Sequence, residues 1–260
     1  MMRNKTKKII LFLLNLLSFI WKLIPRKIRI KIIFLLTIIE SRGNINNSFI
    51  SLFKIEDNLE SLINERALFY GDGKHPKHDL INYHDFFIQN IENGETVLDI
   101  GCGYGAVAFS IAKHFTQNKI IGLDIDTDRL NTAINKNNYT NLEFKLLDVT
   151  KSKLEFNTDV VVLSNVLEHI EHRVQFLTKI IQNTNVKKIL IRIPAFERNW
   201  KIALRSKLKI KYFSDDEHFI EHKYDAIRNE LQDADLNIIS IKSIWGEYWI
   251  KTSVKIDQIK

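Results

Sequence analysis

Apolar and polar positions alternate along the chain in blocks that predict strands separated by helices. Short apolar runs, several of them ending in an acidic residue, are each followed by a segment with helical character. Continuous apolar runs of this kind are typical of strands within a parallel sheet. The five predicted parallel strands are residues 96–100, 119–124, 141–148, 159–165 and 187–193.

The segments on either side of this alternation have different patterns. Residues 236–244 and 249–256 flank Gly246 and predict two late strands in a tight hairpin. Before the first strand, residues 52–69 predict a helix, and the polar, glycine-containing residues 41–48 predict a linker.

Two helices are expected to begin at acidic capping residues. Asp79 precedes a helix that is predicted to run through Phe87 and Ile91. Asp126 precedes the predicted helix at residues 129–138, where its carboxylate would accept hydrogen bonds from the first free N–H groups.

The first forty residues carry two strongly apolar segments and most of the net charge. Residues 9–21 and 28–39 are apolar, and Pro25-Arg26-Lys27 lies between them. Residues 1–40 hold nine Lys and Arg and one acidic residue, whereas the rest of the chain holds 29 basic and 30 acidic residues. This combination predicts an interfacial membrane hairpin that contacts anionic lipid.

Other interpretations of these segments stay open. The helices can instead dock on the domain or on a partner. Neither segment reaches the roughly 20 apolar residues of a membrane span. No small-residue cleavage site of the kind that a secretion signal requires follows the first segment. We therefore expect a cytoplasmic protein that is peripheral on the inner face of a membrane.

Composition narrows the possible classes further. A chain of 260 residues suffices for one large α/β domain with an appendage. Its single cysteine, Cys102, excludes an internal disulfide framework and fits a reducing compartment. Because the excess basic charge lies in the hydrophobic N-terminal segment rather than on the folded domain, nucleic acid is not an expected partner.

The first predicted strand leads into three glycines at alternate positions, Gly101, Gly103 and Gly105, and then into a helix. This order predicts a nucleotide site at the carboxyl edge of a parallel sheet, where a Cβ would hold the ligand off the backbone. Gly101-x-Gly103-x-x-Ala106 also satisfies the dinucleotide fingerprint of NAD enzymes. Asp99 favours a different ligand, because a carboxylate at the strand end repels pyrophosphate and suits a cationic group such as an ammonium.

The motif Asp99-x-Gly101-x-Gly103-x-Gly105 resembles the first motif of class I S-adenosylmethionine (SAM)-dependent methyltransferases. The resemblance covers about residues 91–256 and implies an α/β fold. That fold is a Rossmann-like seven-stranded sheet with helices on both faces, and the late hairpin supplies its antiparallel pair. We expect a hydrophobic helical extension at 1–40, a helical cap or linker at 41–92 and a SAM-binding methyltransferase domain at 93–260.

Acidic residues that end the second and third strands are expected to hold the nucleoside of SAM. Asp124 lies 19 positions after Gly105, the spacing of a ribose-hydroxyl acceptor. The resemblance implies that Asp148 accepts from the adenine amino group, and a helix-cap role for Asp148 is the alternative. The predicted SAM-binding residues are Asp99, Gly101, Cys102, Gly103, Gly105, Asp124, Ile125, Asp148, Val149, Ser164 and Asn165.

His169 and His218 are the candidate catalytic residues, since a histidine can take a proton from a hydroxyl near neutral pH. Glu168-His169 also resembles the Glu-x-x-Glu-His metal motif of ubiquinone-pathway O-methyltransferases and small-RNA 3′-end methyltransferases. Here Asn165 replaces the first glutamate and is a weaker ligand for a hard cation. We therefore expect no metal.

These observations predict a SAM-dependent methyltransferase that acts on an oxygen atom of a small, lipid-linked or glycan acceptor. One alternative is a membrane-recruited protein that binds SAM but has lost catalysis. The other is a metal-assisted RNA 3′-end 2′-O-methyltransferase.

Overall fold

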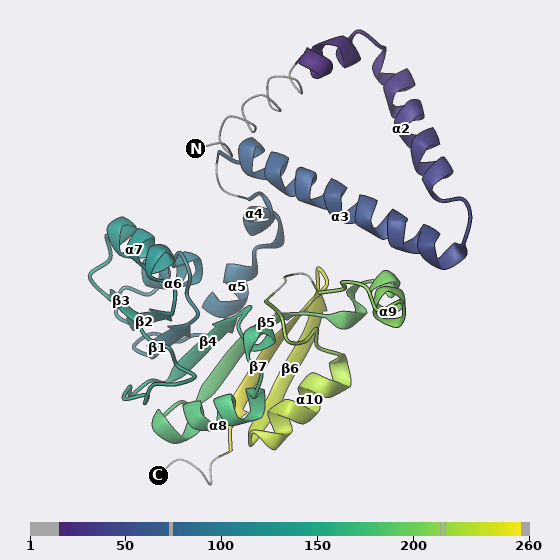
Figure 1. The fold of residues 1–260 in the computed structure, drawn as a ribbon. Helices are drawn as coiled ribbons and strands as arrows, with labels where there is room; N and C mark the ends of the chain where they lie inside the picture. Colours follow the sequence, from purple (N-terminus) through teal and green to yellow (C-terminus); the bar gives the residue numbers. More distant parts are fainter. Residues whose placement is uncertain (1–15, 73–74, 214, 216, 256–260) are drawn as a thin grey trace, which may run out of the picture. The chain divides into compact units, whose positions relative to one another are not determined.

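The computed structural model describes residues 16–72, 75–213, 215 and 217–255. The chain divides into two compact units, Met1–His75 and Pro76–Lys260. The first unit is helical, and the second contains the sheet (Figure 1). The predicted boundaries of the three functional parts, 1–40, 41–92 and 93–260, stay a prediction.

The second unit is built on one seven-stranded sheet, as the sequence predicted. The strands lie in the order β3-β2-β1-β4-β5-β7-β6. The first five are parallel, and β7 runs antiparallel to both β5 and β6. The strands are β1 (Thr96–Ile100), β2 (Lys119–Asp124), β3 (Leu142–Leu146), β4 (Val160–Ser164), β5 (Lys188–Pro194), β6 (Leu236–Ile244) and β7 (Glu247–Val254).

Helices cover both faces of this sheet (Figure 1). Successive strand side chains point to opposite faces, so Val97 joins one core cluster and Leu98 the other. The Val97 cluster packs with α5 (Tyr83–Ile88), α6 (Ala106–His114) and α7 (Thr127–Lys136). The Leu98 cluster packs with α8 (Arg173–Asn183) and α10 (Tyr224–Asp233). The remaining short elements are α4 (Lys77–Ile81), η1 (Leu167–His169), η2 (Phe196–Arg198) and α9 (Trp200–Lys207).

The late hairpin is confirmed, with its second strand beginning two residues earlier than predicted. Ile244 pairs with Glu247, which leaves Trp245 and Gly246 as the two turn residues. Both have positive φ, 54° and 77°, as a two-residue type I′ turn requires. The tight turn brings Glu247 into the sheet, next to β5.

Of the two predicted helix caps, Asp126 is confirmed and Asp79 is not. Asp126 caps α7, since its Oδ1 accepts from the N–H groups of Asp128 and Arg129. The prediction for Asp79 is wrong, because it lies inside α4, and the chain then breaks at Asn82 before α5. Asn82 has a φ of +51°, a left-handed conformation that interrupts the helix.

The first unit contains residues 16–22, which are helical, α2 (Arg26–Glu40) and α3 (Ile45–Tyr70). The predicted linker is only partly confirmed, since Asn44 caps α3 by accepting from Asn46 and Asn47, and the helix therefore begins at residue 45. No residue of α2 is buried. Among the described residues, every helix is too short or too polar to cross a bilayer. The basic residues before residue 16 lie outside the described residues.

Candidate functional site

The glycine loop is fastened at the carboxyl end of β1. The N–H groups of Gly101 and Cys102 both donate to the carbonyl of Leu123 in β2, at 2.7 and 3.0 Å. The N–H of Gly103 donates to Asp124 Oδ2 at 2.6 Å. The loop therefore has a fixed conformation, and it leads directly into α6.

Two of the three glycines are required by the packing of the protein itself. A Cβ on Gly101 would lie 2.7 Å from Cγ2 of Val166, and one on Gly105 would lie 2.7 Å from Cζ of Phe144. Gly103 differs, because a Cβ there would meet no atom of the protein within 4 Å. Gly103 is thus the position of the loop where a ligand can approach the backbone closely.

Asp99 is a buried carboxylate with an unpaired oxygen. The side chain is 1% exposed, and its Oδ2 has no hydrogen-bond partner among the described residues. Burial raises the pKa of Asp99 to about 7, with a smaller contribution from the charge of Asp124. Ionising this buried carboxyl costs free energy, and a cationic ligand group beside it would offset that cost.

The thiol of Cys102 is buried within the core cluster that contains Val97. Burial raises the pKa of Cys102 well above its ordinary value, helped by the charges of Asp99 and Asp124. The protonated thiol is a poor nucleophile, so Cys102 contributes to this site through its backbone and its packing.

The predicted nucleoside residues lie at the same edge of the sheet. Asp124 ends β2 and accepts from Gly103 and from the N–H of Asp126. Ile125 beside it is 71% exposed, an apolar surface suitable for stacking with a base. The N–H of Leu147 donates to the carbonyl of Asp124, which brings the segment after β3 next to β2.

Asp148 and Val149 belong to that segment, and the carboxylate of Asp148 is already engaged. Asp148 accepts from the N–H and hydroxyl of Thr150 and pairs with Lys151 at 2.8 Å. The hydrogen bonds from Lys151 and Thr150 lower the pKa of Asp148 to about 2. Asp148 therefore caps a turn and not the helix of the alternative interpretation, because no helix begins among the described residues between β3 and β4, and Val149 packs into the core.

The end of β4 carries Ser164 and Asn165. Asn165 has a φ of +57°, and its N–H donates to the carbonyl of Arg192 in β5. The Arg192 guanidinium donates to Ser164 Oγ at 3.1 Å and forms two hydrogen bonds with Glu247 of β7, at 2.6 and 2.7 Å. Its carbon Cζ lies 3.8 Å from the ring centroid of Tyr83, in α5.

Sequence reasoning missed this buried arginine network. Arg192 is 4% exposed and fixes Ser164 through its partners in β7 and α5. The available signal was a single charged residue inside the apolar run of the fifth strand. Its meaning depends on Glu247, which is distant in sequence, and so the pattern alone does not disclose it.

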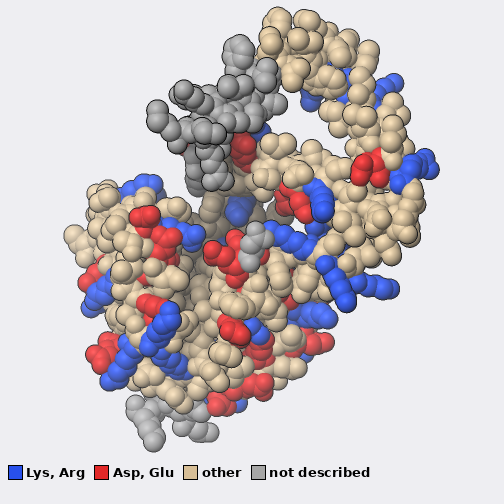
Figure 2. All heavy atoms as spheres, in the orientation of Figure 1, with Lys and Arg blue, Asp and Glu red and all other residues tan. Residues whose placement is uncertain are grey.

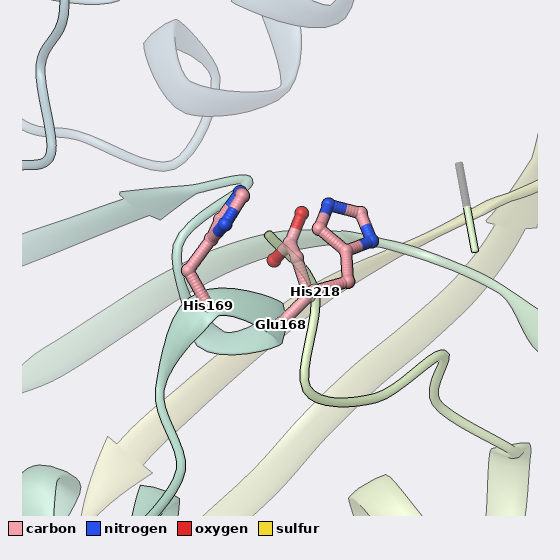
Figure 3. A group of neighbouring side chains, drawn as sticks. All are labelled: Glu168, His169 and His218. Atoms are coloured by element: carbon pink, nitrogen blue, oxygen red, sulfur yellow. The ribbon is translucent and has the colours of Figure 1, made fainter. Parts of the chain in front are cut away.

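The structure brings the two predicted catalytic histidines together with Glu168. Figure 3 shows the three side chains pointing the same way, and the two imidazole rings lie edge to face with their centroids 4.6 Å apart. One ligating atom of each residue lies within 4.8 Å of the others. His169 and Glu168 belong to η1, and His218 comes from the segment between α9 and α10. The N–H of Phe219 donates to the carbonyl of Glu168, which joins the two segments.

The protonation of this cluster follows from burial and from its own charges. Burial raises the pKa of Glu168 to about 7. Burial, together with the charge of His218, lowers the pKa of His169. The pKa of His218 is raised despite its burial, because Glu221 accepts a hydrogen bond from its ring and Glu168 is close.

Comparison with known proteins identifies the fold that carries this site. The family described as "Methyltransferase domain" matches residues 91–232. N-methyltransferase 4 of Papaver somniferum is 32% identical over 95 residues, which span 35% of this chain and 27% of that protein. The malonyl-[acyl-carrier protein] O-methyltransferase of Bacillus cereus is 25% identical over 95 residues, or 36% of this chain and 35% of that protein. The match therefore spans about a third or less of either curated relative's length.

A solved structure shows the same fold over a larger part of the chain. The magnesium protoporphyrin IX methyltransferase of Synechocystis PCC 6803, solved with bound SAH, superposes with a TM-score of 0.54 at 17% identity. The superposition covers 69% of this chain and 83% of that protein. At this identity the likeness concerns the fold alone.

Proposed function

The chain belongs to the class I SAM-dependent methyltransferases, whose cofactor is SAM, and from this membership we propose that it transfers a methyl group to an oxygen of a small, lipid-linked or glycan acceptor. The proposal rests on three features that lie at one edge of the sheet. They are the glycine loop, the unpaired Oδ2 of Asp99 and the cluster of Glu168, His169 and His218.

The residues of the loop fit SAM as a ligand. The unpaired, buried oxygen of Asp99 suits the ammonium group of its methionine part, and the open side of Gly103 allows close approach. The remaining lone pairs of Asp124 can accept from ribose hydroxyls, and exposed Ile125 offers an apolar surface to the adenine. Asp148 stays a proposed adenine ligand.

SAM supplies a methyl group already activated by its sulfonium, so this chain's residues need mainly to position the acceptor. Holding the two reactants in line can contribute roughly 7–11 kcal/mol to lowering the barrier. We place the acceptor beside Ser164 and Asn165 at the end of β4. Arg192 positions Ser164 there.

An oxygen acceptor must also lose its proton. The proposed catalytic residues His169 and His218 lie beside Glu168 at the carboxyl end of β4, where they can take up that proton or hold a group that makes the hydroxyl more acidic. A near-neutral catalytic domain supports a small or lipid-linked acceptor over RNA.

The first unit supports work at a membrane surface. Figure 2 shows broad areas without charged side chains on this helical part, in contrast to the mixed charges of the sheet unit. Large apolar side chains of residues 16–40 are exposed, and Lys and Arg lie among them. We propose that residues 1–40 bind an anionic membrane, where a lipid-linked acceptor would be found.

Replacing Gly103 with Ala tests the position of the cofactor. The fold should survive, because the new Cβ meets nothing in the protein, at a cost of about 1–2 kcal/mol for the positive φ. Affinity for SAM, measured by isothermal titration, should fall at least tenfold, since the methyl occupies the side of the loop that the ligand approaches.

Gly94→Ala is the matched control, because Gly94 also has positive φ and open space but lies in the turn before β1. It should bind SAM like the unmodified chain. Equal affinities of the Gly103 and Gly94 variants would contradict the proposed place of the cofactor.

Methyl transfer itself is tested with SAM carrying a labelled methyl group. The full chain is incubated with a membrane-plus-soluble extract, and labelled products are identified by mass spectrometry. We expect a labelled O-methyl product that is missing with Asp99→Ala. SAM binding without any labelled product would instead support the membrane-recruited binding protein, and no SAM binding would exclude both functions.

A further inference from the structure

We infer that Glu168, His169 and His218 form a binding site for one divalent first-row transition-metal ion. The consequence for methyl transfer rests on the proposed function, whereas the binding site itself does not. The sequence led us to expect no metal, because Asn165 stands where the resembling motif has a glutamate. The structure adds a third nitrogen or oxygen ligand that the motif does not contain, His218.

The spacing of the three side chains is suitable for one ion. Their ligating atoms lie within 4.8 Å of one another. Two ligands that each bond an ion at about 2.1 Å are at most about 4.2 Å apart. The separations in the structure therefore exceed this limit by at most about 0.6 Å.

The surroundings of Glu168 independently favour a bound cation. It is 0% exposed, and neither of its carboxylate oxygens has a hydrogen-bond partner among the described residues. Figure 3 shows this carboxylate directed to the same side as the two imidazole rings. A buried carboxylate without partners is costly, and a cation bonded to it removes the cost.

Each histidine has a second neighbour that suits a metal ligand. The backbone of Glu217 lies beside the ring of His169. Nδ1 of His218 lies 3.2 Å from Glu221 Oε1, and Glu221 also pairs with Arg198. Histidines that bind metals commonly donate their other ring N–H to a carbonyl or a carboxylate, which fixes the tautomer and the ring orientation.

The ligand types select the class of ion. Two imidazoles and one carboxylate suit Zn²⁺, Co²⁺, Fe²⁺ or Mn²⁺, whereas Mg²⁺ and Ca²⁺ prefer oxygen ligands alone. Three protein ligands leave coordination positions open. In the proposed methyltransferase, an acceptor hydroxyl bound at an open position would lose its proton more readily.

The test is a titration of the metal-free full chain with Co²⁺, followed by visible absorption, in the absence of SAM and acceptor. We expect one Co²⁺ per chain, displaced by Zn²⁺ but not by Mg²⁺ at the same concentration. Glu168→Gln and His218→Asn should each weaken binding more than about tenfold. Glu221→Gln changes no ligand but removes the charge that positions His218 and pairs with Arg198, and it should weaken binding about 10- to 100-fold.

His172→Asn is the matched control, because His172 is an exposed neighbour of His169 outside the cluster. It should bind Co²⁺ like the unmodified chain. Thermal unfolding shows whether each variant folds, and Co²⁺ should raise the midpoint of the unmodified chain and of His172→Asn more than that of the other variants. Co²⁺ binding that is absent, or unchanged in Glu168→Gln and His218→Asn, would overturn the inference.

SAM titrations on the same samples separate this inference from the proposed function. Co²⁺ binding without SAM binding would leave the metal site standing and contradict the methyltransferase proposal. SAM binding and methyl transfer without Co²⁺ binding would support the methyltransferase proposal and contradict the metal site.

Discussion

Asp99→Asn is expected to stabilise the ligand-free protein above pH 7 and to weaken SAM binding. The pKa of Asp99 is about 7 in the folded chain, against about 3.9 for an ordinary aspartate. Between these values the folded state binds one proton more than the unfolded state, so stability falls as the pH rises from about 4 to about 7. Above pH 7 the variant should be more stable by a few kcal/mol, since each pKa unit corresponds to about 1.4 kcal/mol.

The same substitution should lower the affinity for SAM by about 10- to 100-fold at pH 8, because it removes a charge-assisted hydrogen bond to the ligand ammonium. In the unmodified chain, affinity should fall as the pH decreases below about 7, where the free carboxyl is protonated. The Asn variant has no such proton, and its affinity should be nearly independent of pH. Calorimetric titrations from pH 5.5 to 8.5 measure both effects.

Asp159→Asn is a control that should change the stability of the folded chain in the opposite direction. Lys187 pairs with Asp159 at 2.8 Å, and this partner helps to hold the pKa of Asp159 below its ordinary value. That stability is present above the unfolded pKa and is lost as the pH falls, so the Asp159 variant should be less stable at neutral pH. It should bind SAM normally. An Asp99→Asn protein with unchanged SAM affinity at every pH would show that Asp99 does not contact the ligand.

The elements that the sequence predicted well are those specified by local pattern. Val160–Ser164 and Lys188–Pro194 are nearly continuous apolar runs, and Asp126 caps its helix through atoms two and three residues away. The break at Asn82 was missed, because a left-handed asparagine inside an apolar pattern leaves the helical period almost unchanged.

The parts of the site that the sequence could not predict depend on residues far apart in the chain. Gly101 and Gly105 are explained by Val166 and Phe144, which no spacing rule connects to a glycine motif. His218 reaches Glu168 because the N–H of Phe219 binds the carbonyl of η1. Local patterns therefore identified the glycines and the two histidines, whereas the tertiary structure determined which residues act together and added Arg192, which the pattern did not disclose.

The full chain is expected to bind anionic vesicles through residues 1–40. Phe19, Leu23 and Phe34 are 66%, 71% and 64% exposed, although burying a side chain of this size contributes roughly 1.5–3 kcal/mol. Basic residues near anionic headgroups add about 1 kcal/mol each. Residues 32–39 contain one polar residue, Thr37, so this stretch of α2, before its last residue Glu40, carries apolar side chains on all sides. A helix segment that is apolar on all sides is normally buried against protein or lipid.

Flotation of the full chain with vesicles that contain anionic lipid measures this binding. It should weaken in neutral vesicles and at high salt, where the Debye length is only a few ångströms. Replacing Phe19, Leu23 and Phe34 together with Ser should lower the partition coefficient more than about 100-fold. Removing residues 1–40, so that the chain begins at Ser41, should abolish flotation.

Ile239→Ser is the matched control, because Ile239 is 55% exposed on β6 in the other unit. It should float like the unmodified chain. The competing possibility is that the helices of the first unit dock on the protein or on a partner, and then the full chain would stay at the bottom of the gradient. That result with anionic vesicles at low salt would show that the membrane assignment is wrong, because neither the exposed apolar side chains nor the basic residues would be contacting lipid.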